Sequence, residues 1–99
     1  MFFIGIDIAK RSHQAAVTDI SGNIIVKPFN FKNSAIGFAQ FLSVLEQNAV
    51  TKESCVIGME STGHYWYPLY FFLVEHQYNV KVFNPIQTAA FREIAIRKV

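Results

Sequence analysis

The stretch FFIGIDIAK (residues 2–10) decides how the fold begins. It has the character of a strand, because Ile4 and Ile6 alternate with other residues as they would if one face packed into a core. Asp7 interrupts this apolar run near its end, two residues after Gly5. A charged carboxylate that is buried without a partner is strongly unfavourable. Asp7 therefore either is capped or solvated at the strand end, or binds something positively charged.

The rest of the sequence predicts an α/β domain with the order β β β α β α β α. Strands are expected at residues 2–8, 13–20, 24–31, 54–60 and 79–84, and helices at 33–48, at 65–77 and from 85 onward. The first three strands have short links and should form an antiparallel meander, whereas the helix-separated strands should pair in parallel. Pro28 has no N–H to donate, which favours an edge position for the third strand.

The first predicted helix has two candidate caps and an apolar stripe. Either Asn33 or Ser34 can cap its N-terminus. The stripe expected to face the core consists of Ala35, Phe38, Leu42 and Leu45, widened by Ile36, Ala39 and Val44.

Composition narrows the class of protein. A chain of 99 residues with 52% hydrophobic and 16% charged residues fits one globular domain and excludes a disordered chain. The formal net charge of +2 is too small to argue for nucleic-acid binding by the whole surface. Cys55 is the single cysteine, so it is expected to be a buried apolar residue in a reducing compartment.

Neither the N-terminus nor the histidines suggest a secreted, membrane or zinc protein. The N-terminus has no basic segment of a signal peptide, and the apolar run at residues 65–74 is too short to span a bilayer. We therefore expect a cytoplasmic protein with no membrane partner. His13, His64 and His76 are scattered, and each is expected to be a surface or capping residue rather than a metal ligand.

A Gly-x-acid pattern occurs twice. The first strand ends in IGID and the fourth in IGME, so Gly5 shares a face with Asp7, and Gly58 shares a face with Glu60. If these strands are parallel neighbours, the two carboxylates lie side by side and repel each other. A divalent cation removes that conflict, and oxygen ligands suit Mg²⁺ or Mn²⁺. The alternative is that each acid is simply solvated at a strand end.

Three segments of the sequence resemble one known family. They are GIDIAKRSHQAAVTD (5–19), GMESTGHYWYPLYFFL (58–73) and VFNPIQTAAFR (82–92). Together they resemble the N-terminal domain of DEDD transposases of the Piv/MooV type, which are insertion-sequence recombinases also described as bridge-RNA-guided. The resemblance implies a RuvC-like, ribonuclease-H-like mixed sheet and the cutting and rejoining of DNA with Mg²⁺ or Mn²⁺. It places the first two catalytic and metal-binding acids on Asp7 and Glu60.

Part of the family pattern is not found in this sequence. The family has a D-x-x-D element shortly after its NP…R segment, but no Asp follows Asp19 here. The resemblance therefore implies that residues 1–99 are an N-terminal catalytic domain truncated before its last acids, without the C-terminal domain and its strand-exchange serine. We expect the 99-residue chain alone to bind metal weakly and to be inactive. DNA, a guide RNA and other copies of the same chain are the partners implied for the longer protein.

Basic and aromatic residues give the expected contacts around the site. The residues expected to contact nucleic acid are Lys10, Arg11, Arg92, Arg97 and Lys98, and a solvated loop is the alternative for Lys10 and Arg11. The aromatic residues of the second helix are expected to pack into the core on one side and to form a protein interface on the other.

Three other functions are alternatives to the transposase interpretation. A junction resolvase or other nuclease of the same fold would lack the serine-bearing domain. An actin-like ATPase or sugar-kinase half would place glycine and hydroxyl residues directly after Asp7, where this chain has IAKRSH. A non-catalytic assembly module is favoured only if Asp7 and Glu60 lie far apart.

Overall fold

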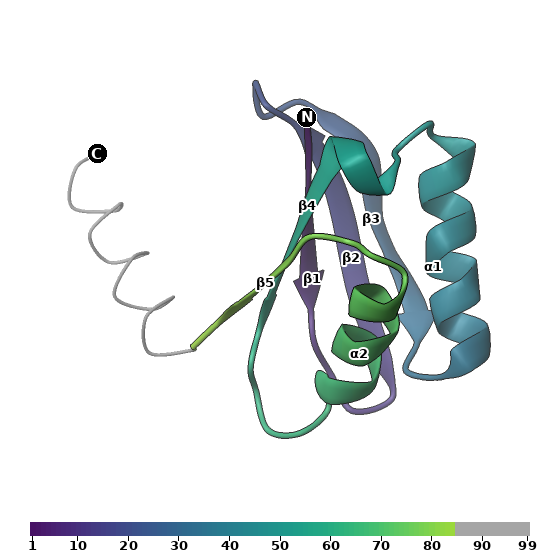
Figure 1. Ribbon diagram of the computed structural model, residues 1–99, viewed down its shortest axis with the longest axis vertical. Coiled ribbons are helices and arrows are strands. Elements are labelled where there is room, and N and C mark those ends of the chain that lie inside the picture. The colour runs from purple at the N-terminus through teal and green to yellow at the C-terminus, as the bar shows by residue number, and fades with distance from the viewer. Residues whose placement is uncertain (85–99) are drawn as a thin grey trace.

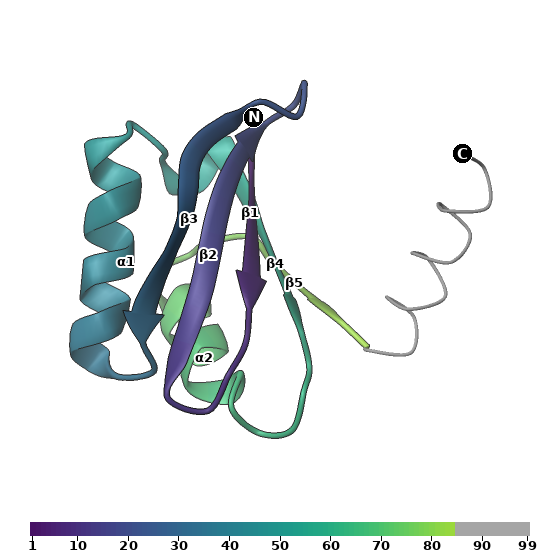
Figure 2. The same ribbon diagram turned by 180° about the vertical axis from the view of Figure 1, so that it is seen from behind.

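The strands and helices follow the predicted order to the end of the fifth strand. The computed structural model describes residues 1–84 (Figures 1 and 2). Its elements are β1 (Phe2–Asp7), β2 (Ser12–Asp19), β3 (Ile24–Lys32), α1 (Ala35–Gln47), a 3₁₀ turn (Lys52–Ser54), β4 (Cys55–Glu60), α2 (Tyr67–Glu75) and β5 (Val80–Phe83). The helical segment predicted from Pro85 onward lies outside the described residues.

The strands form one mixed sheet with the order β3-β2-β1-β4-β5. β1, β2 and β3 are joined as an antiparallel meander, and β4 runs parallel to both β1 and β5. β3 is an edge strand, which confirms the expectation from Pro28. β1 is the central strand of the five, between β2 and β4, and Asp7 is its last residue.

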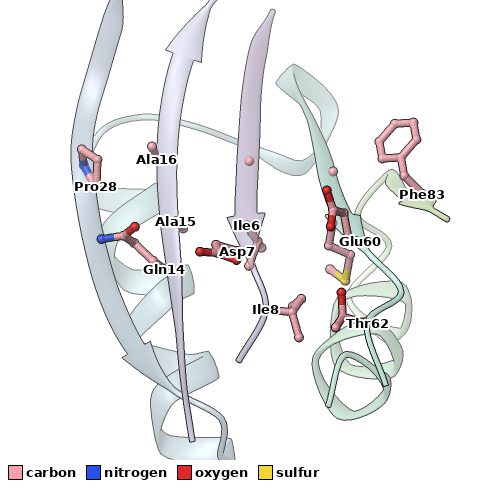
Figure 3. A pocket seen from close by; sticks show the side chains of 13 residues that line it. Ile6, Asp7, Ile8, Gln14, Ala15, Ala16, Pro28, Glu60, Thr62 and Phe83 are labelled. Carbon is pink, nitrogen blue, oxygen red and sulfur yellow. The ribbon is translucent and has the colours of Figure 1, made fainter. Parts of the chain in front are cut away.

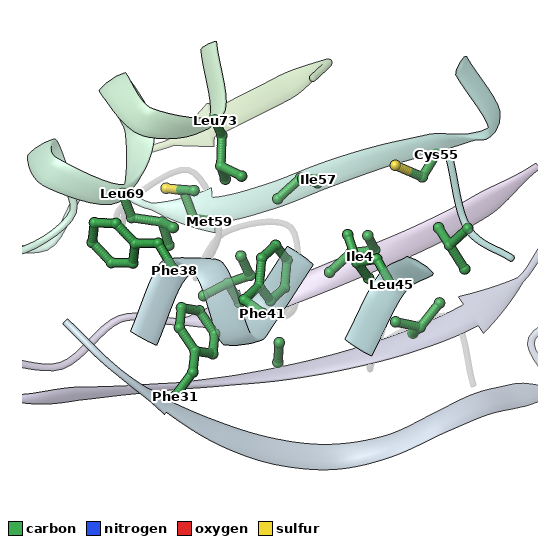
Figure 4. Close-up of a cluster of buried hydrophobic side chains, with 14 residues drawn as sticks. Ile4, Phe31, Phe38, Phe41, Leu45, Cys55, Ile57, Met59, Leu69 and Leu73 are labelled. Atoms are coloured by element: carbon green, nitrogen blue, oxygen red, sulfur yellow. The ribbon is translucent and has the colours of Figure 1, made fainter. Parts of the chain in front are cut away.

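Both helices pack on the same face of the sheet. Alternate strand residues point to that face and meet apolar side chains of the two helices (Figure 4). The core consists of Ile4, Ile6, Ala15, Val17, Phe31, Cys55, Ile57 and Met59 from the strands, Phe38, Phe41 and Leu45 from α1, Leu69 and Leu73 from α2, and Val50. In the view from behind, no helix of residues 1–84 lies over the other face of the sheet (Figure 2). The residues of that second face are therefore accessible in the described part of the chain.

Helix α1 is capped as expected, but its buried stripe differs from the prediction. The Ser34 hydroxyl accepts a hydrogen bond from the Gly37 N–H at 3.2 Å, so Ser34 rather than Asn33 is the cap. Phe41 was not predicted to be in the stripe, yet its side chain is 0% exposed. The predicted stripe residues that are exposed instead are Ala35, Ile36 and Ala39. The stripe is rotated from the predicted one because Phe38, Phe41 and Leu45 follow helical spacing on the side that meets β3.

Helix α2 divides into a buried and an exposed side, as its aromatic sequence predicted. Leu69 and Leu73 are fully buried, whereas Tyr67 and Phe71 are exposed and stack on each other with ring centroids 5.9 Å apart. That this exposed side is a protein interface stays a prediction. Neither α1 nor α2 has the length and apolar character of a membrane-spanning helix.

Candidate active site

The parallel pairing of β1 with β4 places the two predicted site acids on neighbouring strand ends. Gly5 pairs with Gly58, and the following pair is Ile6 with Met59. Asp7 and Glu60 are the next residues along their strands, and both lie on the face opposite the helices. The adjacency predicted from the repeated Gly-x-acid pattern is confirmed. In Figure 3 the Asp7 carboxylate leans toward β2, and Glu60 extends along β4, so the two carboxylates do not point at each other.

A pocket of about 630 Å³ opens in front of these acids. It is lined by Gly5, Ile6, Asp7, Ile8, Gln14, Ala15, Ala16, Pro28, Gly58, Met59, Glu60, Thr62 and Phe83 (Figure 3). A Cβ atom added at Gly5 would have no neighbour within 4 Å, whereas one at Gly58 would lie 3.3 Å from the Phe83 ring. Because the two glycines have no side chains, they leave the space next to the carboxylates unfilled.

Two polar residues of this pocket were not predicted from the sequence to belong to the site. Gln14 pairs directly with Asp7 across the antiparallel β1–β2 ladder and lines the same pocket, and its amide extends from β2 toward β3 (Figure 3). Thr62 follows Glu60 by two residues and lines the same pocket. The alternation of β2 was the signal for Gln14, because alternation places it on the face of Asp7 once the meander is assumed.

The basic residues predicted to contact nucleic acid are only partly described. Lys10 and Arg11 are exposed and lie in the β1–β2 link (residues 8–11), directly after Asp7. Neither residue lines the pocket. Arg92, Arg97 and Lys98 lie outside the described residues.

His13 lies in the core rather than at the surface, and of the two expected roles it has that of a cap, because its Nδ1 accepts a hydrogen bond from the Ala9 N–H at 3.1 Å. Its side chain is 0% exposed and contacts the Phe31 ring edge-on, with ring centroids 5.4 Å apart. The cause is the alternation of β2, which sends His13, Ala15 and Val17 into the core together. Burial lowers the pKa of His13, while the Asn33 side chain and the charge of Asp7 act in the opposite direction.

We expect the chain to lose stability as the pH falls below about 6.5, the ordinary pKa of histidine. Because the pKa of His13 is lowered on folding, the unfolded chain binds that proton more tightly than the folded chain. The stabilising effect is therefore present above the unfolded pKa and is lost as the pH drops through the folded value. Urea unfolding at several pH values measures it. His13→Leu should flatten this pH dependence and His64→Gln should not, since His64 is exposed; equal slopes in all three proteins would contradict the assignment.

The described residues hold two acids at this site and no larger ligand cluster. Within residues 1–84, no group of three or more His, Cys, Asp or Glu side chains is gathered so that it could hold a metal ion. The polar residues that share the pocket with the two carboxylates are Gln14 and Thr62, which offer an amide and a hydroxyl oxygen. Carboxylate, amide and hydroxyl oxygens together with water are a donor set that a hard, hydrated cation accepts. The residues present are thus compatible with a divalent cation, although they supply few charged ligands.

Comparison with known proteins agrees with this arrangement. No curated protein sequence matches the chain. RuvC of T. thermophilus in complex with a Holliday junction substrate has 14% sequence identity and a TM-score of 0.60, covering 88% of this chain and 66% of that chain. A second structure of Thermus thermophilus RuvC has 17% identity and a TM-score of 0.55 with the same coverage. The chain therefore spans slightly less than two thirds of RuvC, and the likeness confirms the predicted RuvC-like, ribonuclease-H-like fold.

The family is established by a separate match. The family model DEDD_Tnp_IS110, described as a transposase, matches residues 4–99, which is nearly the whole chain. It includes both strand ends that carry the Gly-x-acid pattern. The chain belongs to the IS110-type DEDD transposase family.

Proposed function

We propose that this chain is the N-terminal catalytic domain of an insertion-sequence transposase, a recombinase that cuts and rejoins DNA with the help of a divalent metal ion. Family membership supports the transposase class over an ATPase or a non-catalytic module. The observation that carries the proposal is the parallel register of β1 and β4, which brings Asp7 and Glu60 to one pocket on the open face of the sheet.

Asp7 and Glu60 are the proposed metal ligands and catalytic residues. Asp7 is exposed, so its side chain can change rotamer toward Glu60 at little energetic expense. Two carboxylates that converge repel each other unless a cation lies between them, and their oxygen atoms suit Mg²⁺ or Mn²⁺. When bound, such an ion would polarise a phosphate oxygen and assist in forming the attacking nucleophile. Gly5 and Gly58 leave the space in which a phosphate group could approach the acids.

The DNA is proposed to approach across the face of the sheet opposite α1 and α2. Lys10 and Arg11 are exposed in the link that follows Asp7, where they could neutralise phosphates without reading the bases. The same role is proposed for Arg92, Arg97 and Lys98. A guide RNA and self-association are proposed from the family resemblance, and a cytoplasmic location is proposed from the sequence.

A titration with Mn²⁺ tests the proposed metal site. The 99-residue chain should bind Mn²⁺ weakly, because it offers few charged ligands and this class of ion keeps much of its water. Asp7→Asn and Glu60→Gln should each reduce the affinity by about tenfold or more, since even outer-shell partners of metal ligands typically contribute 10- to 100-fold. Glu75→Gln is the matched control, because Glu75 is an exposed acid at the end of α2.

Two outcomes would contradict this proposal. If Glu60→Gln and Glu75→Gln change the Mn²⁺ affinity equally, the cation binds by general electrostatic attraction rather than at the pocket. Plasmid cleavage measures the second point, because the chain alone should not cleave DNA. Metal-dependent cleavage that disappears in Asp7→Asn would identify a compact nuclease instead of an incomplete transposase site.

A further inference from the structure

Asn33 bonds to the two links that follow the proposed site acids. Its backbone N–H donates to the Arg11 carbonyl at 2.9 Å. Its side-chain Nδ2 donates to the Lys10 carbonyl at 3.2 Å and to the Tyr65 carbonyl at 3.3 Å. Lys10 and Arg11 belong to the β1–β2 link after Asp7, and Tyr65 belongs to the β4–α2 link (residues 61–66) after Glu60. One side chain thus joins two segments that are far apart in the sequence.

The pairing of β1 with β4 does not connect the two links. The last recorded pair between β1 and β4 is Ile6 with Met59, so the pairing of these strands stops just before the acids. Each strand end is held on its outer side, since Asp7 pairs with Gln14 of β2 and the Ser61 N–H donates to the Phe83 carbonyl of β5 at 2.9 Å. Those bonds do not join the β1 end to the β4 end. The Asn33 amide does.

Asn33 is not occupied as a helix cap. Ser34 caps α1, although both residues were candidates for that position. The orientation of the Asn33 amide follows from its partners, because two carbonyl oxygens require the NH₂ group and leave Oδ1 as the acceptor on the other side. Oδ1 is buried and forms no hydrogen bond of ordinary geometry within residues 1–84.

His13 offers the donor that this oxygen lacks. Its Nδ1 accepts a hydrogen bond from the Ala9 N–H at 3.1 Å, so a neutral ring carries its proton on Nε2. Nε2 is also buried and without a hydrogen bond of ordinary geometry in the described part of the chain. The Asn33 side chain acts to raise the pKa of His13 against the effect of burial, which is the direction expected for an acceptor that faces Nε2. A buried donor and a buried acceptor that are both unpaired are unfavourable, and a small adjustment that pairs them relieves both.

We propose that Asn33, with His13 as its buried partner, is a positioning residue that ties the β1–β2 link to the β4–α2 link and so sets the spacing of Asp7 and Glu60. The assignment of a metal-binding role to that spacing rests on the proposed function. The tie itself rests only on the hydrogen bonds of Asn33 and His13. His13 adds a second attachment, because its Nδ1 accepts a hydrogen bond from the Ala9 N–H in the β1–β2 link.

Amide hydrogen exchange followed by NMR tests the tie. Asn33→Ala should raise the exchange rates in both links by about fivefold or more, because the local opening free energy falls when their shared bonds are lost. Asn33→Asp has the same shape but no NH₂ donor, and it should have the same effect. Asn48→Ala is the matched control, since the Asn48 side chain donates one bond to the Val44 carbonyl at the other end of α1. The inference is overturned if both links keep their wild-type rates in the two Asn33 variants.

The wild-type chain and the Mn²⁺ titration complete the test. In the wild type, ¹⁵N NMR should find the neutral His13 ring protonated on Nε2, and a proton on Nδ1 would overturn the pairing. Asn33→Ala should weaken Mn²⁺ binding about tenfold, as outer-shell partners of metal ligands do. If Glu60→Gln loses affinity but both Asn33 variants keep it, the tie does not set the spacing and the inference fails. If Glu60→Gln itself keeps full affinity, the proposed function fails, while the exchange rates still decide whether the tie exists.

Discussion

Phe41→Ala should lower the free energy of unfolding by about 3–5 kcal/mol, the usual range for a buried phenylalanine. Phe41 is 0% exposed and lies at the centre of the layer between α1 and the sheet. Its ring stands 4.8 Å from that of Phe31 and 6.1 Å from that of Phe29, centroid to centroid. Removing the ring loses its burial and leaves a cavity that the sheet and the helix cannot close completely.

Urea unfolding followed by circular dichroism measures this change. Phe71→Ala is the matched control, because Phe71 is also a helical phenylalanine but is 58% exposed on α2. It should change the stability by no more than about 0.5 kcal/mol, as surface substitutions usually do. Since domains of this kind are stable by only about 5–15 kcal/mol, Phe41→Ala could leave a large unfolded fraction at room temperature. Equal losses for the two variants would show that the packing of α1 on the sheet is not as described.

The topology could be predicted because the local patterns were consistent. Alternation marked the strands, Pro28 marked the edge, and short links marked the meander. The repeated Gly-x-acid pattern also predicted the pairing of β1 with β4, since matched glycines and acids suggest matched positions on parallel neighbours. The same pattern predicted that Asp7 and Glu60 end neighbouring strands, and the register confirms that placement.

The surroundings of these acids could not be predicted by the same patterns. His13 was expected to be a surface or capping residue, although the alternation of β2 sends it inward with Ala15 and Val17. Asn33 was weighed only as a helix cap, because its bonds to Lys10 and Tyr65 depend on where two distant links meet. Such contacts follow from tertiary structure, which a local pattern does not contain.

The rotation of the α1 stripe has a similar origin. Several apolar residues of the helix could face the core, and helical spacing alone does not choose among overlapping stripes. The choice depends on which side of the helix can approach β3 most closely. Gly37 allows that approach, because it lies buried in the first turn of α1 directly against the end of β3.

Gly37→Ala tests this close approach, and the sign of its effect is informative. Helix propensity alone predicts that alanine stabilises the helix by about 1 kcal/mol relative to glycine. A Cβ at this position would lie 2.6 Å from the Lys32 carbonyl carbon and 2.7 Å from the Lys32 nitrogen, and would overlap the Lys32 carbonyl oxygen. Backbone atoms cannot rotate away as a side chain can, so the overlap should destabilise by about 3 kcal/mol, the upper end for an overpacked core. The overlap outweighs the propensity, and we expect a net loss of about 2 kcal/mol.

The matched control for this change is Gln40→Ala in the same helix, which replaces an exposed residue and should be neutral or slightly stabilising. Urea unfolding of both variants gives the comparison, and a Gly37→Ala protein as stable as the control would mean that α1 stands further from β3. We expect Gly37→Ala to affect the candidate active site as well. Lys32 precedes Asn33, so a displaced Lys32 backbone moves the residue whose amide joins the two links. Faster amide exchange in the β1–β2 and β4–α2 links of Gly37→Ala, and not of Gln40→Ala, would connect the packing of the helix to the spacing of Asp7 and Glu60.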